Sequence, residues 1–196
     1  MYGSRTEVLA DAAAIIHAEL SACIDEGVPY VQLDNPHYPD YISDDRRAQW
    51  QALGVEPERA LLDDIAADNA SVAGLDRSLA TVGMHLCRGN GALGRWHTAG
   101  GYERIAEAVF GGLDVDRFLL EYDSERAGGF EPLRFVPRGK LVVLGLITTK
   151  SAELESADVV LQRIEEASKY VPVEDLALSP QCGFASALVE IGRAHV

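Results

Sequence analysis

The sequence predicts an α/β fold in which helices cover a parallel β-sheet. Short strand-like segments alternate with helix-like segments along most of the chain, which is the rhythm of strand–helix–strand units. The strand-like segments are apolar throughout, as is typical of parallel strands that are buried on both faces. A length of 196 residues, with 47% hydrophobic and 24% charged residues, fits one globular domain.

The chain is expected to open on a helix. Ser4-Arg5-Thr6-Glu7 has the form of a capping box, and Gly27 supplies a helix stop. Between them, apolar residues recur at helical spacing. They are Val8, Leu9, Ala12, Ile15, Ile16, Leu20 and Cys23. Cys23 is therefore predicted to be a small buried side chain of this helix, without a chemical role.

The next elements set up the sheet. Tyr30-Val31-Gln32-Leu33 is predicted to be a buried strand that runs into Asp34-Asn35-Pro36, where the proline ends strand pairing. Helices are expected over 42–51 and over 57–75, the second with Pro57 in its first turn. The later elements are expected to be strand 81–87, helix 101–110, strand 118–122, strand 141–146, helix 157–170 and strand 176–178. The stretch 123–140 is expected to be an ordered loop over the strand ends.

Composition excludes several classes of function. A net charge of -14 argues against nucleic-acid binding, which needs clustered cationic side chains. No apolar run is long enough to span a bilayer, and the amino terminus lacks the order of a signal peptide. Three widely spaced cysteines fit a reducing compartment. We therefore expect a cytoplasmic protein with small-molecule chemistry, no nucleic-acid partner and no membrane association.

The segment GMHLCRGN, residues 83–90, raises the possibility of a metal site. His85 and Cys87 are two residues apart in a predicted strand, so their side chains lie on the same face. A histidine and a cysteine packed at a strand end would give the same pattern, and the pair alone specifies no further ligand. Arg88, which follows, fits either an anion-binding residue or a solvated loop residue.

Other candidate ligands lie at the carboxyl ends of the remaining strands, where parallel α/β proteins place their working residues. These strand ends carry Asp34, His85 with Cys87, Glu121, the segment 148–150 and Cys182. Two thiolates, an imidazole and a carboxylate are a donor set that zinc accepts in a tetrahedron. Spacing alone leaves open whether these side chains converge.

Five motifs of this chain resemble the carboxyl-terminal catalytic barrel of cobalamin-independent methionine synthase, and more closely the shorter single-barrel proteins of that superfamily. They are YVQLDNP, MHLCRGN, FLLEYDSERAGGFEPLRFVP, VVLGLITTK and LALSPQCGFAS. The resemblance runs from the first strand to Ser186. It implies a (β/α)₈ TIM barrel, of which residues 1–190 carry about the last five strands.

The resemblance also implies a site and a reaction. Zinc is expected to be the cofactor, bound by His85, Cys87, Glu121 and Cys182. The implied reaction transfers a methyl group from a methylated folate, 5-methyltetrahydropteroylglutamate, to the thiol of homocysteine and forms methionine. Asp34 corresponds to the aspartate that holds the homocysteine amino group. The resemblance assigns no catalytic proton donor and no oligomeric state.

Three departures from the family pattern keep other functions open. Asn35 stands where methionine synthases usually have glutamate, and the histidine near the penultimate strand is replaced within Thr148–Lys150. The segment from Asp34 to His85 is also longer. Alkyl transfer to another thiol, as in coenzyme M transferases, and a methyl-corrinoid donor are therefore alternatives. A barrel that holds zinc only structurally is an alternative of a different class.

The sequence also predicts that strands are missing before Met1 and that the last six residues are not native. A (β/α)₈ barrel needs three more strands, which we expect to precede Met1, and the chain as written is expected to expose strand edges and to be inactive. Residues 191–196, Ile-Gly-Arg-Ala-His-Val, match the translation of a common sequencing adapter. We therefore expect this tail to be non-native.

Overall fold

Five parallel strands form one sheet in sequence order, β1-β2-β3-β4-β5. The computed structural model describes residues 2–89, 96–151 and 153–182, so the predicted tail 191–196 lies outside the described residues. The strands are β1 (Tyr30–Asp34), β2 (Thr81–Leu86), β3 (Arg117–Glu121), β4 (Leu141–Ile147) and β5 (Leu176–Pro180). The predicted α/β class and parallel sheet are confirmed, and all five carboxyl strand ends meet at one edge.

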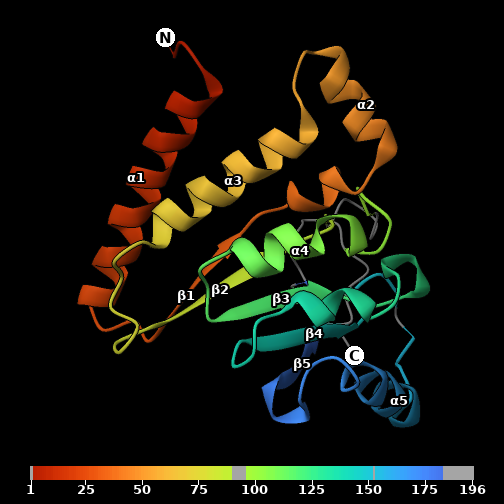
Figure 1. Ribbon diagram of the computed structural model, residues 1–196. Helices are drawn as coiled ribbons and strands as arrows, with labels where there is room; N and C mark the ends of the chain where they lie inside the picture. The colour runs from red at the N-terminus through yellow and green to blue at the C-terminus, as the bar shows by residue number, and fades with distance from the viewer. Residues whose placement is uncertain (1, 90–95, 152, 183–196) are drawn as a thin grey trace.

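Helices connect the strands and pack mainly on one side of the sheet (Figure 1). The α-helices are α1 (Arg5–Asp25), α2 (Asp44–Ala52), α3 (Pro57–Val72), α4 (Glu103–Gly112) and α5 (Ala157–Ala167). The 3-10 helices are η1 (Tyr38–Tyr41), η2 (Glu125–Ala127), η3 (Glu131–Phe135) and η4 (Val173–Asp175). The stretch 123–140 is ordered as predicted, and η2 and η3 lie within it.

Caps explain where the helices begin. The hydroxyl of Ser4 accepts a hydrogen bond from the backbone N–H of Glu7, which confirms the predicted start of α1. The hydroxyl of Ser43 accepts from the N–H of Arg46, so α2 begins at Asp44 rather than at Ile42. α3 ends at Val72 instead of continuing to 75, because Gly74 adopts a φ of +77° that a helix does not allow.

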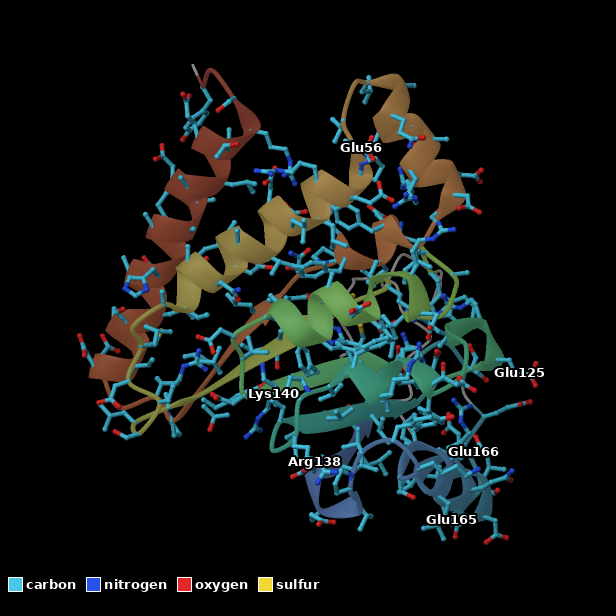
Figure 2. The ribbon with its side chains drawn as sticks, in the orientation of Figure 1. Glu56, Glu125, Arg138, Lys140, Glu165 and Glu166 are labelled. Atoms are coloured by element: carbon cyan, nitrogen blue, oxygen red, sulfur yellow. The ribbon has the colours of Figure 1, made fainter. Side chains whose placement is uncertain are left out.

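The alternation of side chains along each strand separates a packing face from a chemical face. Val82, Met84 and Leu86 of β2 are fully buried in the core between sheet and helices. His85 lies between them in sequence and points to the opposite face. Charged side chains such as Glu56, Glu125 and Glu165 lie on the outer surface (Figure 2). None of the helices in the described parts of the chain is long and apolar enough to cross a lipid bilayer.

The predicted burial of Cys23 is wrong, because its side chain is exposed. α1 packs on α3 along a different line of residues, with Ala13 and Ile24 buried and His17 Nδ1 lying 3.2 Å from the Ser71 carbonyl oxygen. Ile15, on the predicted apolar stripe, is 64% exposed. Helical periodicity identifies an apolar side of a helix, but the position of the neighbouring helix decides which side is buried.

Candidate metal centre

Four side chains meet at the carboxyl end of the sheet. His85 lies in β2, Cys87 directly follows it, Glu121 ends β3, and Cys182 follows β5. One donor atom from each lies within 4.8 Å of every other donor atom. The structure therefore brings together the four residues that the sequence could place only at separate strand ends. Parallel pairing causes this convergence, because it aligns the ends of β2, β3 and β5 at one edge.

The separations between donor atoms are close to those of a tetrahedral metal site. Cys182 Sγ lies 3.4 Å from Cys87 Sγ, 3.5 Å from His85 Nε2 and 3.1 Å from Glu121 Oε1. His85 Nε2 lies 3.8 Å from Glu121 Oε1. Donor atoms about 2.0–2.3 Å from a tetrahedral zinc ion are roughly 3.3–3.8 Å apart. Three of the four separations, 3.4, 3.5 and 3.8 Å, fall in this range, whereas that between Cys182 Sγ and Glu121 Oε1 is shorter, at 3.1 Å. The residues present therefore fit zinc in chemistry, and small shifts of the side chains would bring all four donor atoms to its bond lengths.

Backbone groups orient two of the candidate ligands. Nδ1 of His85 lies 3.2 Å from the carbonyl oxygen of Leu119. A proton on Nδ1 would satisfy that contact and leave the Nε2 lone pair facing the cluster, as in many metal sites. The backbone N–H of Gly89 donates to Cys87 Sγ over 3.3 Å, which favours the thiolate.

Glu121 is fully buried and has a partner for each carboxylate oxygen. Oε1 accepts from the backbone N–H of Arg88 over 3.1 Å, and Oε2 accepts from the side-chain amide of Gln181 over 3.4 Å. Burial raises the pKa of Glu121 to about 7, and the nearby Cys87 adds to the effect, although hydrogen bonds oppose it. A buried carboxylate is costly without a compensating cation, so this environment suits a bound metal ion.

The two thiols titrate as a pair. The hydrogen bond from Cys182 lowers the pKa of Cys87 to about 4, with further support from His85 and from the Gly89 N–H. The same bond, together with burial, raises the pKa of Cys182. Burial lowers the pKa of His85, but its contact with Cys87 and the nearby negative charges outweigh burial and raise it overall. Cys87 is thus the more acidic thiol of the pair, and metal binding, which requires both sulfurs deprotonated, would displace the proton that Cys182 retains.

Arg88 is a buried residue beside the cluster. It is neither a solvated loop residue nor an exposed anion-binding residue. It is 1% exposed, and its guanidinium lies 4.3 Å from the ring centre of Tyr102. It also donates to the carbonyl oxygens of Gly100 and Ala127. The hydroxyl of Tyr102 in turn accepts from the Glu121 N–H over 3.1 Å. The sequence carried no signal for this buried arginine.

Asp34 lies beside the cluster without joining it. It ends β1 and pairs in register with His85, and it is exposed to solvent at the carboxyl edge of the sheet. Partial burial raises its pKa, with a smaller opposing effect from His85. The side chain of Asn35 donates to Asp68 of α3 over 3.0 Å. Asp34 is therefore accessible to a ligand near the cluster, whereas Asn35 is engaged by the helix layer.

Residues 148–150, which are predicted to stand in place of the family histidine, follow the carboxyl end of β4 at this edge. The Thr148 hydroxyl donates to Asp123 over 2.9 Å, and Thr149 is buried. Lys150 Nζ donates to the carbonyl oxygen of Gly89 over 3.3 Å. Lys150 is thus the member of this segment that reaches the loop after Cys87.

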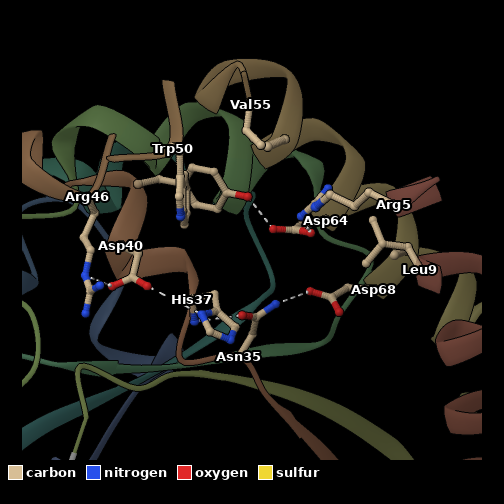
Figure 3. A pocket seen from close by; sticks show the side chains of 13 residues that line it. Arg5, Leu9, Asn35, His37, Asp40, Arg46, Trp50, Val55, Asp64 and Asp68 are labelled. Atoms are coloured by element: carbon tan, nitrogen blue, oxygen red, sulfur yellow. Dashed lines mark hydrogen bonds and ion pairs between the residues drawn. The ribbon is translucent and has the colours of Figure 1, made fainter. Parts of the chain in front are cut away.

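Two cavities differ in their relation to the cluster. A cavity of about 600 Å³ lies among α1, η1, α2 and α3 and includes Trp50, Asp64 and Asp68 (Figure 3). A smaller cavity of about 240 Å³ is lined by His85, Cys182 and neighbouring residues. We place the chemistry at the smaller cavity despite its size, because the convergent donor atoms lie there.

The sheet and the cluster together define a parallel α/β protein with a candidate metal site at its carboxyl strand ends. The sequence profile of the family described as "Cobalamin-independent synthase, Catalytic domain" matches residues 3–196. The chain belongs to this family, which confirms the resemblance seen in its motifs.

Relatives and solved structures agree with this assignment. The uncharacterised protein YxjG of Bacillus subtilis is 46% identical over 85% of this chain and 44% of its own length. A methionine synthase of Pyrococcus abyssi is 26% identical over 93% of this chain and 44% of its own. The chain thus spans about half the length of the curated relatives that it matches.

Among solved structures, a putative vitamin-B12 independent methionine synthase from Listeria monocytogenes superposes with a TM-score of 0.72 at 36% identity, over 91% of this chain and 49% of the other. A B12-independent methionine synthase from Shewanella sp. W3-18-1, in complex with selenomethionine, gives a TM-score of 0.70 at 23% identity, over 93% and 50%. These TM-scores support the predicted partial barrel.

Proposed function

We propose that this chain carries the zinc site of a cytoplasmic methyltransferase that forms methionine from homocysteine, with a methylated folate as methyl donor. The observation that carries the proposal is the convergence of four zinc-type donor atoms within 4.8 Å at the strand ends. The name of the Pyrococcus abyssi relative, methionine synthase, supports the reaction. His85, Cys87, Glu121 and Cys182 are proposed as the ligands.

The donor set suits thiol activation. A zinc ion held by these residues would supply a Lewis acid that lowers the pKa of a coordinated substrate thiol from its ordinary value of about 8.5. Two protein thiolates and the carboxylate of Glu121 make the ligand set anionic. This charge would keep the bound substrate sulfur electron-rich and therefore nucleophilic.

Asp34 is proposed to bind the amino group of homocysteine. Its carboxylate is exposed at the rim, and it lies in register with the ligand His85. An ammonium group at this carboxylate would gain a charge-assisted hydrogen bond. The amino acid would then be oriented with its sulfur toward the four ligands.

Alkyl transfer to a different thiol, of the coenzyme M type, is the second candidate. The observation that favours it is the amide side chain of Asn35, which donates to Asp68 and supplies no carboxylate. Asp34, in register with His85, is then the one carboxylate of the Asp34-Asn35 pair near the cluster. A site with fewer carboxylates places less demand on a substrate amino group.

A thiol panel tests the proposal. The protein is loaded with Co²⁺, whose bond to a new thiolate gives a charge-transfer absorption band, and is titrated with homocysteine and with coenzyme M. Homocysteine should produce the band at the lower concentration, and Asp34→Asn should weaken its binding without affecting coenzyme M. Tighter binding of coenzyme M would favour the second candidate. A spectrum that no thiol changes would indicate a structural site.

A further inference from the structure

Gln181, which directly follows β5, contacts the candidate ligand Glu121 at the end of β3. We propose that Gln181 is a positioning residue that holds one oxygen of the Glu121 carboxylate away from the metal and so leaves the other oxygen as the single donor. The inference rests on the proposed zinc site and adds a residue that acts through a ligand rather than on the metal.

Gln181 is fixed in place by burial and by its backbone. It is 2% exposed, and its backbone N–H donates to the carbonyl oxygen of Ile147 over 2.9 Å. It directly precedes Cys182, whose sulfur lies in the cluster. The side chain therefore leaves the same short segment that supplies a ligand, and its position is coupled to that ligand.

The two oxygens of Glu121 have different surroundings. Oε1 faces the cluster, at 3.1 Å from Cys182 Sγ and 3.8 Å from His85 Nε2. Oε2 lies 3.4 Å from Gln181 Nε2. Both oxygens accept a hydrogen bond, Oε1 from the backbone N–H of Arg88 and Oε2 from Gln181. They differ in direction, because the contacts with Cys182 and His85 are made by Oε1 while Oε2 points to Gln181. The contact with Gln181 therefore fixes the carboxylate in the orientation that presents Oε1 to the cluster.

The amide of Gln181 has one orientation that satisfies an ionised Glu121. Its Oε1 lies 3.4 Å from the Thr148 hydroxyl oxygen, and that hydroxyl donates to Asp123 over 2.9 Å. If the amide were reversed, its oxygen would face the carboxylate and two acceptors would meet. Only the orientation with the NH₂ group toward Glu121 provides a donor.

Gly145 makes this arrangement possible. The pairing of β4 with β5 is irregular between Gly145 and Ile147. A Cβ atom on Gly145 would lie 2.8 Å from the Cα of Gln181 and 2.8 Å from the Leu120 carbonyl oxygen. The missing side chain thus lets the segment of Gln181 approach β4 closely enough to reach Glu121.

The test compares Gln181→Met, which keeps the length of the side chain and removes its donor, with Gln181→Asn, which keeps the amide but shortens it. Ser179→Ala is the matched control, because the Ser179 hydroxyl donates only locally, to the Pro180 carbonyl oxygen. The dissociation constant of zinc is measured by competition with a chelator. The visible spectrum of the Co²⁺ form, which reports coordination number, is the second readout.

Both Gln181 variants should bind zinc roughly 10–100-fold more weakly, as is typical when a partner of a metal ligand is lost. Their Co²⁺ bands should lose intensity, because a second carboxylate oxygen raises the coordination number. Unchanged affinity and spectrum in a folded variant, either Gln181→Met or Gln181→Asn, would overturn the inference while leaving the zinc site intact. A wild-type protein that binds no zinc would instead overturn the proposed function.

Discussion

The sulfur of Cys182 lies 3.1 Å from Oε1 of Glu121, although the two residues are 61 positions apart in the chain. Two side chains that both carry negative charge when ionised are stable at this distance only if a proton or a cation lies between them. Here the Cys182 thiol donates its proton to the carboxylate, and a metal ion bound by both groups would take the place of that proton.

Loss of either cysteine ligand should abolish tight zinc binding. Cys87→Ser and Cys182→Ser replace a soft thiolate by a hydroxyl, and the affinity should fall by more than roughly 100-fold, since loss of an outer partner alone costs 10–100-fold. Cys23→Ser is the matched control, because Cys23 is exposed on α1. Zinc content after dialysis measures the effect, and equal content in Cys87→Ser and Cys23→Ser would contradict the assignment.

Zinc affinity should fall as pH falls, and more steeply below pH 7. Binding must displace the proton that Cys182 retains, and below the Glu121 pKa of about 7 it must also displace a proton from that carboxyl group. Protonation of His85 acts in the same direction. Glu121→Gln, which cannot titrate, should bind zinc more weakly but show a shallower dependence on pH. Parallel pH profiles for the two proteins would refute this role of Glu121.

Gly145→Ala should lower both the stability of the protein and its affinity for zinc, although Gly145 is not itself a candidate ligand. Its Cβ would meet the backbone atoms of Gln181 and Leu120 at 2.8 Å, so the strand ends must shift, at a cost of about 1–3 kcal/mol. Gly111→Ala is the control, because nothing lies within 4 Å of its Cβ position. Chemical denaturation should show a loss of stability for the first variant alone, and zinc affinity should fall with it.

Tyr102→Phe should destabilise the protein by about 1–3 kcal/mol, because it leaves the buried N–H of Glu121 without its acceptor. Tyr30→Phe provides the comparison, since the Tyr30 hydroxyl bonds to the exposed Gln32. Thermal unfolding of both variants measures the difference. Equal stability would show that the hydroxyl of Tyr102 does not support the Glu121 backbone.

The sequence predicts the parallel sheet and the position of three of the four candidate ligands, but not the approach of the fourth, Cys182. Alternation along a strand places His85 and Cys87 on one face, and parallel pairing brings Glu121 to the same edge. Cys182 follows β5, so its approach to the cluster depends on a register that local patterns do not encode.

Features that depend on contacts between elements could not be predicted. Cys23 is exposed because α3 packs against a different side of α1. Arg88 is buried because Tyr102 and two backbone carbonyl groups surround its guanidinium. Gln181 reaches Glu121 only because of the irregular pairing of β4 and β5. Each outcome is set by the relative placement of segments that are far apart in sequence.

The most direct test of a thiol-activating zinc site is X-ray absorption at the zinc edge, with and without homocysteine. Without substrate, the spectrum should show two sulfur ligands, from Cys87 and Cys182, together with lighter donors. Addition of homocysteine should raise the sulfur count from two to three. A sulfur count that stays at two would contradict thiol activation and would make the four residues a structural metal site.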